Sequence, residues 1–336
     1  MKKLVALLLV LVCVCTFAFA NGETENAADK VYTIQIGHTF SVESTRHKAL
    51  EIFKQECEEK SNGRLEVVIQ AGGVLGSEAD MQESMKMGTL EAFVGGPFDT
   101  ITPKLNLILM PFFYEDQDAL MRVANSEIGQ VIIEDAKKNN LQILSIGDGG
   151  SRQFTNNVHE IRAPKDLKGL KMRIPGIDSI KQCMLALGAN PVSIPFADVY
   201  MALKTGVADG QENPIATIGD GKFYEVQKYL TKIDYQFHPE VFTMNLDYYN
   251  NLPEDLRAIV DEAAQHYGVN QNKFRLDMDK EYIANIEKSD CQIYYPTAAE
   301  KAAFMEACQP VYDYFIEKGD FTAEELARTK AISQGK

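Results

Sequence analysis

Two arginines stand where strands of the predicted sheet end. Arg152 follows the glycine-rich run 147–150, and Arg173 lies in the segment 171–174 (KMRI), directly before Pro175-Gly176. Alternation along a strand places Arg173 on the face opposite to the apolar residues of that segment. A guanidinium group matches a carboxylate through two parallel hydrogen bonds. Two such side chains on adjacent strand ends would therefore form a receptor for an organic anion.

The segment 205–214 (TGVADGQENP) contains a second concentration of polar side chains. Gln211 and Asn213 carry amides, which supply both hydrogen-bond donors and acceptors and so suit hydroxyls and carboxylates alike. Asp209 and Glu212 add carboxylates. Polar groups at this density indicate either a solvated turn or the wall of a pocket.

The sequence contains few residue patterns that indicate catalysis or metal binding. The five histidines have no metal-ligand spacing, and the chain contains no G-x-S-x-G elbow, P-loop or strand-linked G-x-G-x-x-G. His38 at the end of the first strand and His238 in 237–239 (FHP) are candidates for a cleft, although each is more often a structural histidine. Glu78 with His38 is the one acid–base pair that can be constructed. We therefore predict no catalytic residue and no metal site.

The first thirty residues differ from the rest of the chain. Two lysines and an apolar run, 4–19, precede a small-x-small site that ends at Ala20, which is typical of a secretory signal peptide. Neither Cys13 nor Cys15 follows the small residue of a lipoprotein box, so a free mature protein is favoured over a lipid-anchored one. Residues 1–20 are interpreted as a signal peptide cleaved near Ala20, and residues 21–30 as a flexible N-terminus.

The net charge and the cysteine content of the chain limit which binding partners and cross-links are expected. Removal of the two leader lysines takes the formal net charge from −14 to about −16, which argues against nucleic acid or an anionic membrane surface. Four cysteines remain, Cys57, Cys183, Cys291 and Cys308, and no pair has metal-ligand spacing. Export permits disulfides. Cys291–Cys308 would close the shortest loop, and buried free thiols are the equal alternative.

The elements that must position these residues form two α/β series. Strands are expected at 31–37, 65–69, 90–94, 141–146, 170–174 and 191–194, and helices at 44–60, from 77, at 179–187, at 197–204 and at 254–288. A length of 336 residues favours two domains. Because no linker separates the series, the chain is expected to cross between them more than once and to leave a cleft. In largely parallel sheets, ligands bind beyond the carboxyl ends of strands, where the glycine loops 72–76 and 95–96 lie.

Five blocks together carry a resemblance to a known family. They are 150–157 (GSRQFTNN), 166–175 (DLKGLKMRIP), 187–191 (LGANP), 199–206 (VYMALKTG) and 209–214 (DGQENP). In this order and spacing they resemble the DctP-type solute-binding proteins of tripartite ATP-independent periplasmic (TRAP) transporters. The likeness extends over nearly the whole mature chain.

The resemblance implies a two-domain, periplasmic-binding-protein-like α/β fold of type II character, with hinge crossings, a long helix and the ligand in the interdomain cleft. Domain I would comprise 31–149 plus about 238–277, and domain II 150–237 plus about 278–331. The protein would be periplasmic, would need no cofactor and would not be an enzyme. It would deliver an organic acid to integral membrane TRAP subunits.

The resemblance also implies roles for the polar residues. Arg173 would bind the ligand carboxylate and Arg152 would assist it, while Asn213 and Gln211 would belong to the pocket wall. Asp209 and Glu212 would brace the turn.

Phe196 would pack on the ligand, although core packing is the more common fate of a phenylalanine. Some sialic-acid-binding relatives carry a carboxylate where this chain has 95–97 (GGP). Glu78, His38 and Thr39 are left for hydroxyl contacts, so a uronate, an aldonate or a C4-dicarboxylate is expected.

Two other functions remain open at this stage. An exported enzyme acting on a sugar acid would use the same cleft, with Glu78 and His38 as acid and base, and would release product rather than unchanged ligand. A ligand-sensing module for a receptor would share every feature of the binding protein.

Overall fold

The computed structural model describes residues 30–336. The expected signal peptide and nearly all of the expected flexible N-terminus lie outside the described residues. The strands are β1 (Tyr32–Gly37), β2 (Leu65–Gln70), β3 (Ala92–Gly95), β4 (Leu141–Asn156), β5 (Lys171–Ile174), β6 (Asn190–Ser193), β7 (Gly210–Pro214), β8 (Tyr229–Asn245) and β9 (Gln292–Tyr294). No helix within 30–336 is long and apolar enough to cross a membrane.

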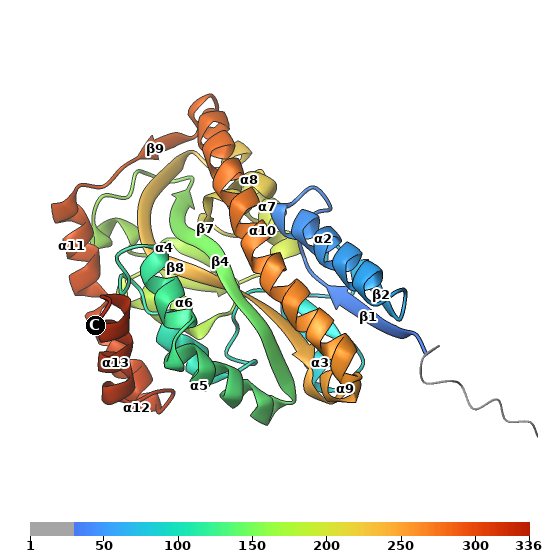
Figure 1. Ribbon diagram of the computed structural model, residues 1–336. Coiled ribbons are helices and arrows are strands. Elements are labelled where there is room, and N and C mark those ends of the chain that lie inside the picture. The colour runs from blue at the N-terminus through green and yellow to red at the C-terminus, as the bar shows by residue number, and fades with distance from the viewer. Residues whose placement is uncertain (1–29) are drawn as a thin grey trace, which may run out of the picture.

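The strands of the described chain form one mixed sheet. Their order is β2-β1-β3-β8-β4-β7-β5-β6, and β9 pairs with β8. The outer pairs are parallel, as expected, but β3–β8, β8–β4 and β4–β7 are antiparallel. The expectation of a largely parallel sheet is wrong for the centre, because β8 carries the chain back through the middle of the molecule (Figure 1).

Strands β4 and β8 are the two long central strands. The sequence predicted a strand only over 141–146 and none over 229–245. Instead, β4 continues through its glycines and pairs with β8 on both sides of a register shift between Asp148 and Ser151. Gly150 has φ +92° at this shift, and a Cβ there would lie 3.2 Å from the Cβ of Pro214. The glycine therefore lets one strand cross the molecule with a local irregularity.

The helices lie around this sheet. They are α2 (Thr45–Lys60), α3 (Glu78–Lys86), α4 (Gln117–Ala124), α5 (Glu127–Ala136), α6 (Asp178–Ala186), α7 (Val199–Thr205), α8 (Ile215–Asp220), α9 (Leu246–Asn251), α10 (Glu254–Glu287), α11 (Ala298–Ala307), α12 (Gln309–Lys318) and α13 (Ala323–Ser333). Helices α2 and α3 begin where the sequence predicted them, because Ser44 caps α2 and Ser77 with Asp80 forms a capping box on α3. The predicted long helix is α10, which packs along α2 and β4 (Figure 1).

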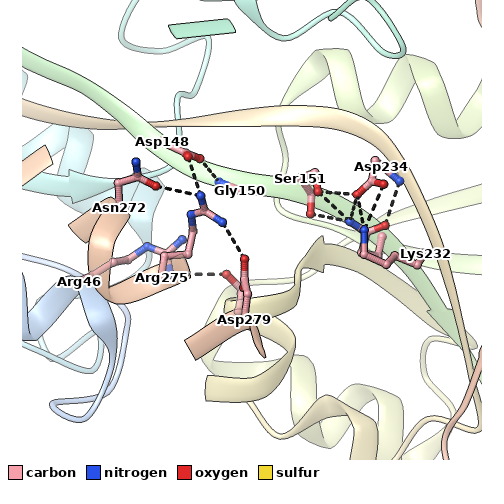
Figure 2. Close-up of polar contacts among 11 residues, drawn as sticks. Arg46, Asp148, Gly150, Ser151, Lys232, Asp234, Asn272, Arg275 and Asp279 are labelled. Carbon is pink, nitrogen blue, oxygen red and sulfur yellow. Dashed lines mark hydrogen bonds and ion pairs between the residues drawn. The ribbon is translucent and has the colours of Figure 1, made fainter. Parts of the chain in front are cut away.

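Helix α10 is tied to the register shift by a buried ion pair. Arg275 donates to Asp148 at 2.5 Å, to Asp279 at 2.6 Å and to Asn272 at 2.9 Å. The other oxygen of Asp148 accepts from the backbone N–H of Gly150 at 2.7 Å. Figure 2 shows the Arg275 guanidinium between these carboxylates, directly beside β4. The long helix is thus fastened at the point where the β4–β8 pairing is irregular.

The C-terminal helices pack against a segment that lies far from them in sequence. Lys104 forms an ion pair with Glu325 of α13 at 2.7 Å, and Arg122 donates to the carbonyl oxygen of Ser333 at 2.6 Å. The segment 103–136 and the C-terminal helices therefore form one packed region. The domain limits 31–149 plus 238–277 and 150–237 plus 278–331 remain a proposal.

All four cysteines of the described chain are buried free thiols. Cys291 and Cys308 lie in different apolar clusters, so the shortest-loop disulfide is not formed. Cys308 lies instead beside Cys183, with the two sulfur atoms 3.6 Å apart.

Candidate functional site

A cleft opens at the carboxyl ends of β3 and β5, beside the centre of the sheet. The empty space in this cleft, part of which is open to solvent, is about 440 Å³. Its polar lining consists of Arg46, Glu78, Arg152, Arg173, Asn213, Thr217, His238 and Glu240. Phe40 and Phe196 from opposite sides approach one another, with ring centroids 5.2 Å apart.

Arg173 lies at the end of β5, as the sequence predicted, and lines the cleft. Its neighbours Met172 and Ile174 are buried in the apolar core. Within residues 30–336, its one hydrogen bond runs from Nε to the carbonyl oxygen of Ile194, at 2.8 Å, and no carboxylate pairs with it. Burial lowers the pKa of Arg173 to about 10, so the guanidinium remains charged at neutral pH.

Arg152 also lines the cleft, but its charge is compensated. Its guanidinium forms a buried ion pair with Glu212, and Nη2 also donates to Asn213 Oδ1 at 3.1 Å. The Tyr235 hydroxyl donates to Glu212 as well. Burial opposes the charge on Arg152, yet the attraction of Glu212 is large enough to raise its pKa. Glu212 is thus paired with Arg152 inside the protein, where it was expected to brace a turn.

The segment 210–214 is a strand, β7, rather than a turn. All five of its residues are buried, because β7 lies between β4 and β5. Gln211 donates to Thr155 Oγ1 at 2.9 Å and accepts from Asn213 Nδ2 at 2.6 Å. Asn213 lines the cleft and Gln211 does not. Gln211 therefore orients Asn213 from behind.

Glu78 is the first residue of α3 and reaches the cleft from the other side. Its carboxylate accepts from the backbone N–H of Gly96 at 3.3 Å. A Cβ on Gly95 would lie 2.4 Å from Glu78 Oε1, so the glycine leaves the space that this carboxylate occupies. Burial raises the pKa of Glu78, although the Gly96 N–H and the Arg173 charge oppose the shift.

Two residues expected in the cleft lie outside its lining. The His38 ring is held by the Phe40 N–H at 3.2 Å and by His47 at 3.0 Å, and burial lowers its pKa to about 3. Thr39 is buried next to it. The structure does not join His38 to Glu78, so it does not assemble the acid–base pair of the enzyme alternative.

Sequence reasoning missed Thr217 and also two charged lining residues, Arg46 and Glu240. They form a buried ion pair, although Arg46 lies in helix α2 and Glu240 in strand β8. No local pattern signals such a pair across 194 residues. His238, named from the sequence only as a candidate, does line the cleft. Its Nδ1 is buried and has no hydrogen-bond partner within residues 30–336, and burial together with Arg152 and Arg46 keeps its pKa well below the usual value.

Comparison with known proteins identifies the family. The model of bacterial extracellular solute-binding protein family 7, DctP, matches residues 36–318. The chain belongs to the DctP family. DctP proteins bind solutes and are not enzymes, so the enzyme alternative is set aside.

Individual DctP relatives match over most of their length. A solute-binding protein of Chromohalobacter salexigens is 31% identical over 274 residues, which cover 81% of this chain and 81% of that protein. A TRAP periplasmic solute-binding protein from Roseobacter denitrificans, solved with β-D-glucuronate, has a TM-score of 0.84 and 27% identity, covering 90% of this chain and 99% of that chain. One from Sulfurospirillum deleyianum, solved with succinate, has the same TM-score, identity and coverage. The family thus includes proteins for sugar acids and for dicarboxylates.

Proposed function

We propose that this DctP protein captures a hydroxylated monocarboxylic acid, such as a uronate or an aldonate, and delivers it to the membrane subunits of a TRAP transporter. Arg173 carries the proposal. Its guanidinium is buried in the cleft and charged, and no carboxylate of the described chain is paired with it. A ligand carboxylate would supply the missing counter-charge through the fork of Nη1 and Nη2.

The charge balance of the lining supports one ligand carboxylate rather than two. Arg152 is paired with Glu212, and Arg46 with Glu240. Arg173 is the one lining cation without a hydrogen-bonded carboxylate; Glu78 also lines the cleft and interacts with its charge, but burial raises the pKa of Glu78 and so disfavours its charged form. A C4-dicarboxylate would bring a second negative charge, and the described lining of the cleft has no second unpaired cation to bind it. Burial of an unpaired charge is costly.

The remaining polar groups suit hydroxyls. Glu78 offers a carboxylate, Asn213 an amide, and His238 an imidazole ring whose lowered pKa keeps it neutral. Phe196 and Phe40 would cover the apolar faces of a sugar acid.

The test is isothermal titration of purified protein with a panel of uronates, aldonates and C4-dicarboxylates, together with mass spectrometry of any acid that co-purifies. We expect tight binding of a hydroxylated monocarboxylate and recovery of that acid unchanged. Preference for succinate or malate over every sugar acid would contradict the proposed ligand class. Delivery is tested by uptake into vesicles that contain the membrane subunits, where the loaded protein should be required.

A further inference from the structure

The ion pair between Arg46 and Glu240 forms a second charged feature of the cleft wall. Arg46 donates from Nε to one Glu240 oxygen, and the Tyr267 hydroxyl donates to the other. Arg46 Nη1 also donates to Thr217 Oγ1 at 3.4 Å. Its guanidinium lies 4.0 Å from the ring centroid of Phe40, which fixes its plane. Both charges are thus held in place and buried, while both residues line the cleft.

This pair stands apart from the Arg173 end of the cleft. Arg173 is influenced by Glu212, Arg152 and Glu78, none of which contacts Arg46 by a hydrogen bond or ion pair. Glu78 and His238 line the same cleft as both arginines. The charges of Arg173 and Arg46 both act on the pKa of Glu78, and those of Arg152 and Arg46 on the pKa of His238. A ligand whose carboxylate meets Arg173 would therefore direct its other end toward Arg46 and Glu240.

We propose that Arg46, Glu240 and His238 form a second subsite that accepts the hydroxyl end of the ligand and rejects a second carboxylate, and that Glu240 is the residue that sets this selectivity. The inference rests on the proposed function, because it takes Arg173 as the carboxylate anchor. With Glu240 paired to it, Arg46 presents N–H donors but no net charge. A ligand hydroxyl can accept from these donors or bond to the His238 ring. A second ligand carboxylate there would find the charge of Arg46 already neutralised by Glu240, and so would be buried without a counter-charge of its own.

The experiment uses acids that differ at one end only. D-Gluconate and D-glucarate share a six-carbon hydroxylated chain, and D-erythronate and meso-tartrate share a four-carbon one. In each pair the first acid ends in a hydroxymethyl group and the second in a carboxylate. We expect the wild-type protein to bind the monocarboxylate of at least one pair more tightly than its dicarboxylate partner.

Glu240→Gln keeps the shape of the side chain and removes its charge, so that Arg46 becomes a second uncompensated cation. The ratio of the two dissociation constants should then shift toward the dicarboxylate by tenfold or more. The double variant Arg46→Gln/Glu240→Gln, in which neither charge remains, should lose this shift even where Glu240→Gln alone is less stable. Glu262→Gln, an exposed change of the same charge in the Lys60–Glu262 pair, should leave the ratio unchanged.

The outcomes separate the two claims. An unchanged ratio in folded Glu240→Gln would overturn the subsite while leaving Arg173 as the anchor. Tighter wild-type binding of the dicarboxylate in both pairs would overturn the subsite and the monocarboxylate class together. Binding of none of the four acids or of any uronate, or undiminished binding in Arg173→Gln, would overturn the proposed function itself. Melting curves of every variant confirm that each is folded.

Discussion

At the scale of single residues, the decisive feature is a buried arginine without a counter-ion. Arg173 could be chosen from the sequence because it stands at a strand end before Pro175 and opposite apolar neighbours. Arg46 could not, because its burial depends on Glu240 on a strand 194 residues away. His38 and Thr39 are not among the residues that line the cleft; their place after β1 can be read from the sequence, but the direction of their side chains cannot.

Arg173→Gln should abolish most ligand binding and stabilise the unliganded protein. Loss of one partner of a buried charge pair costs roughly 2–5 kcal/mol of binding free energy, or about 30-fold to several thousand-fold in affinity. Without ligand, the same change removes an uncompensated buried charge, so the free energy of unfolding should rise by about 1–3 kcal/mol.

Titration calorimetry and urea unfolding of the wild type, Arg173→Gln and Arg173→Lys measure both effects. Arg173→Lys keeps the charge without the fork and should weaken binding less. The exposed Arg162, replaced by Gln, is the control and should alter neither quantity. Lower stability of unliganded Arg173→Gln would contradict the view that this charge is unpaired.

At the scale of elements, the sequence predicted those whose signals are local. The helices expected at 44–60, from 77 and at 254–288 are present as α2, α3 and α10, and the first two begin at the N-caps Ser44 and Ser77. Strand β8 was missed because it is buried along most of its length, contains Pro239 and lacks clean alternation. The proline is tolerated because it faces Asp148, where the pairing with β4 becomes irregular. Such a strand is specified by distant partners rather than by its own pattern.

Gly210→Ala should weaken strand β7 and the site that it supports. A Cβ at Gly210 would lie 2.2 Å from the carbonyl oxygen of Thr155 on β4, so the strands would have to separate. We expect the free energy of unfolding to fall by about 1–3 kcal/mol, and ligand affinity to fall with the displacement of Asn213. Gly147→Ala on β4, where the nearest atom would be 3.6 Å away, is the control for urea unfolding and should cost much less.

Helix α6 obtains its cap from a distant loop, which gives stability a defined pH dependence. Its N-cap residue, Ile177, makes no side-chain cap, and Asp99 accepts from the Asp178 N–H at 3.1 Å. Burial raises the pKa of Asp99 to about 6 from a usual value of 3.8. The folded protein therefore holds a proton that the unfolded chain has lost between these values, so stability falls as pH rises through that window.

Asp99→Asn should flatten this part of the profile. The amide oxygen of the variant side chain can still accept the hydrogen bond from the Asp178 N–H, but this side chain no longer takes up a proton. Relative to the variant, the wild type should lose at most about 3 kcal/mol of unfolding free energy between pH 4 and pH 7. Urea unfolding of both proteins at pH steps across this range provides the measurement. Parallel profiles would show that Asp99 titrates normally.

At the scale of the whole molecule, two long strands and one long helix connect the sides of the cleft. The Asp148–Arg275 pair holds α10 beside the register shift at Gly150 in β4 (Figure 2), and we expect any bending of β4 to occur there. We expect ligand to favour a closed arrangement, because closure removes water from the Arg173–carboxylate pair.

X-ray scattering should therefore give a smaller radius of gyration when a saturating acid is added. Arg173→Gln, measured at the same acid concentration, should keep the larger radius because it lacks the anchor for the carboxylate. A scattering curve of the wild type that does not change at saturation would contradict closure on the ligand.

The unpaired charge of Arg173 should also affect how often the unliganded protein closes. In the described structure this guanidinium is already buried, with the Ile194 carbonyl as the one hydrogen-bond acceptor of its side chain, and keeping the cleft shut without a ligand carboxylate costs on the order of several kcal/mol. The empty protein should for that reason spend little time shut. Membrane subunits that recognise the closed conformation would then seldom bind the unliganded protein. The buried charge of Arg173 would by itself reduce such unproductive binding.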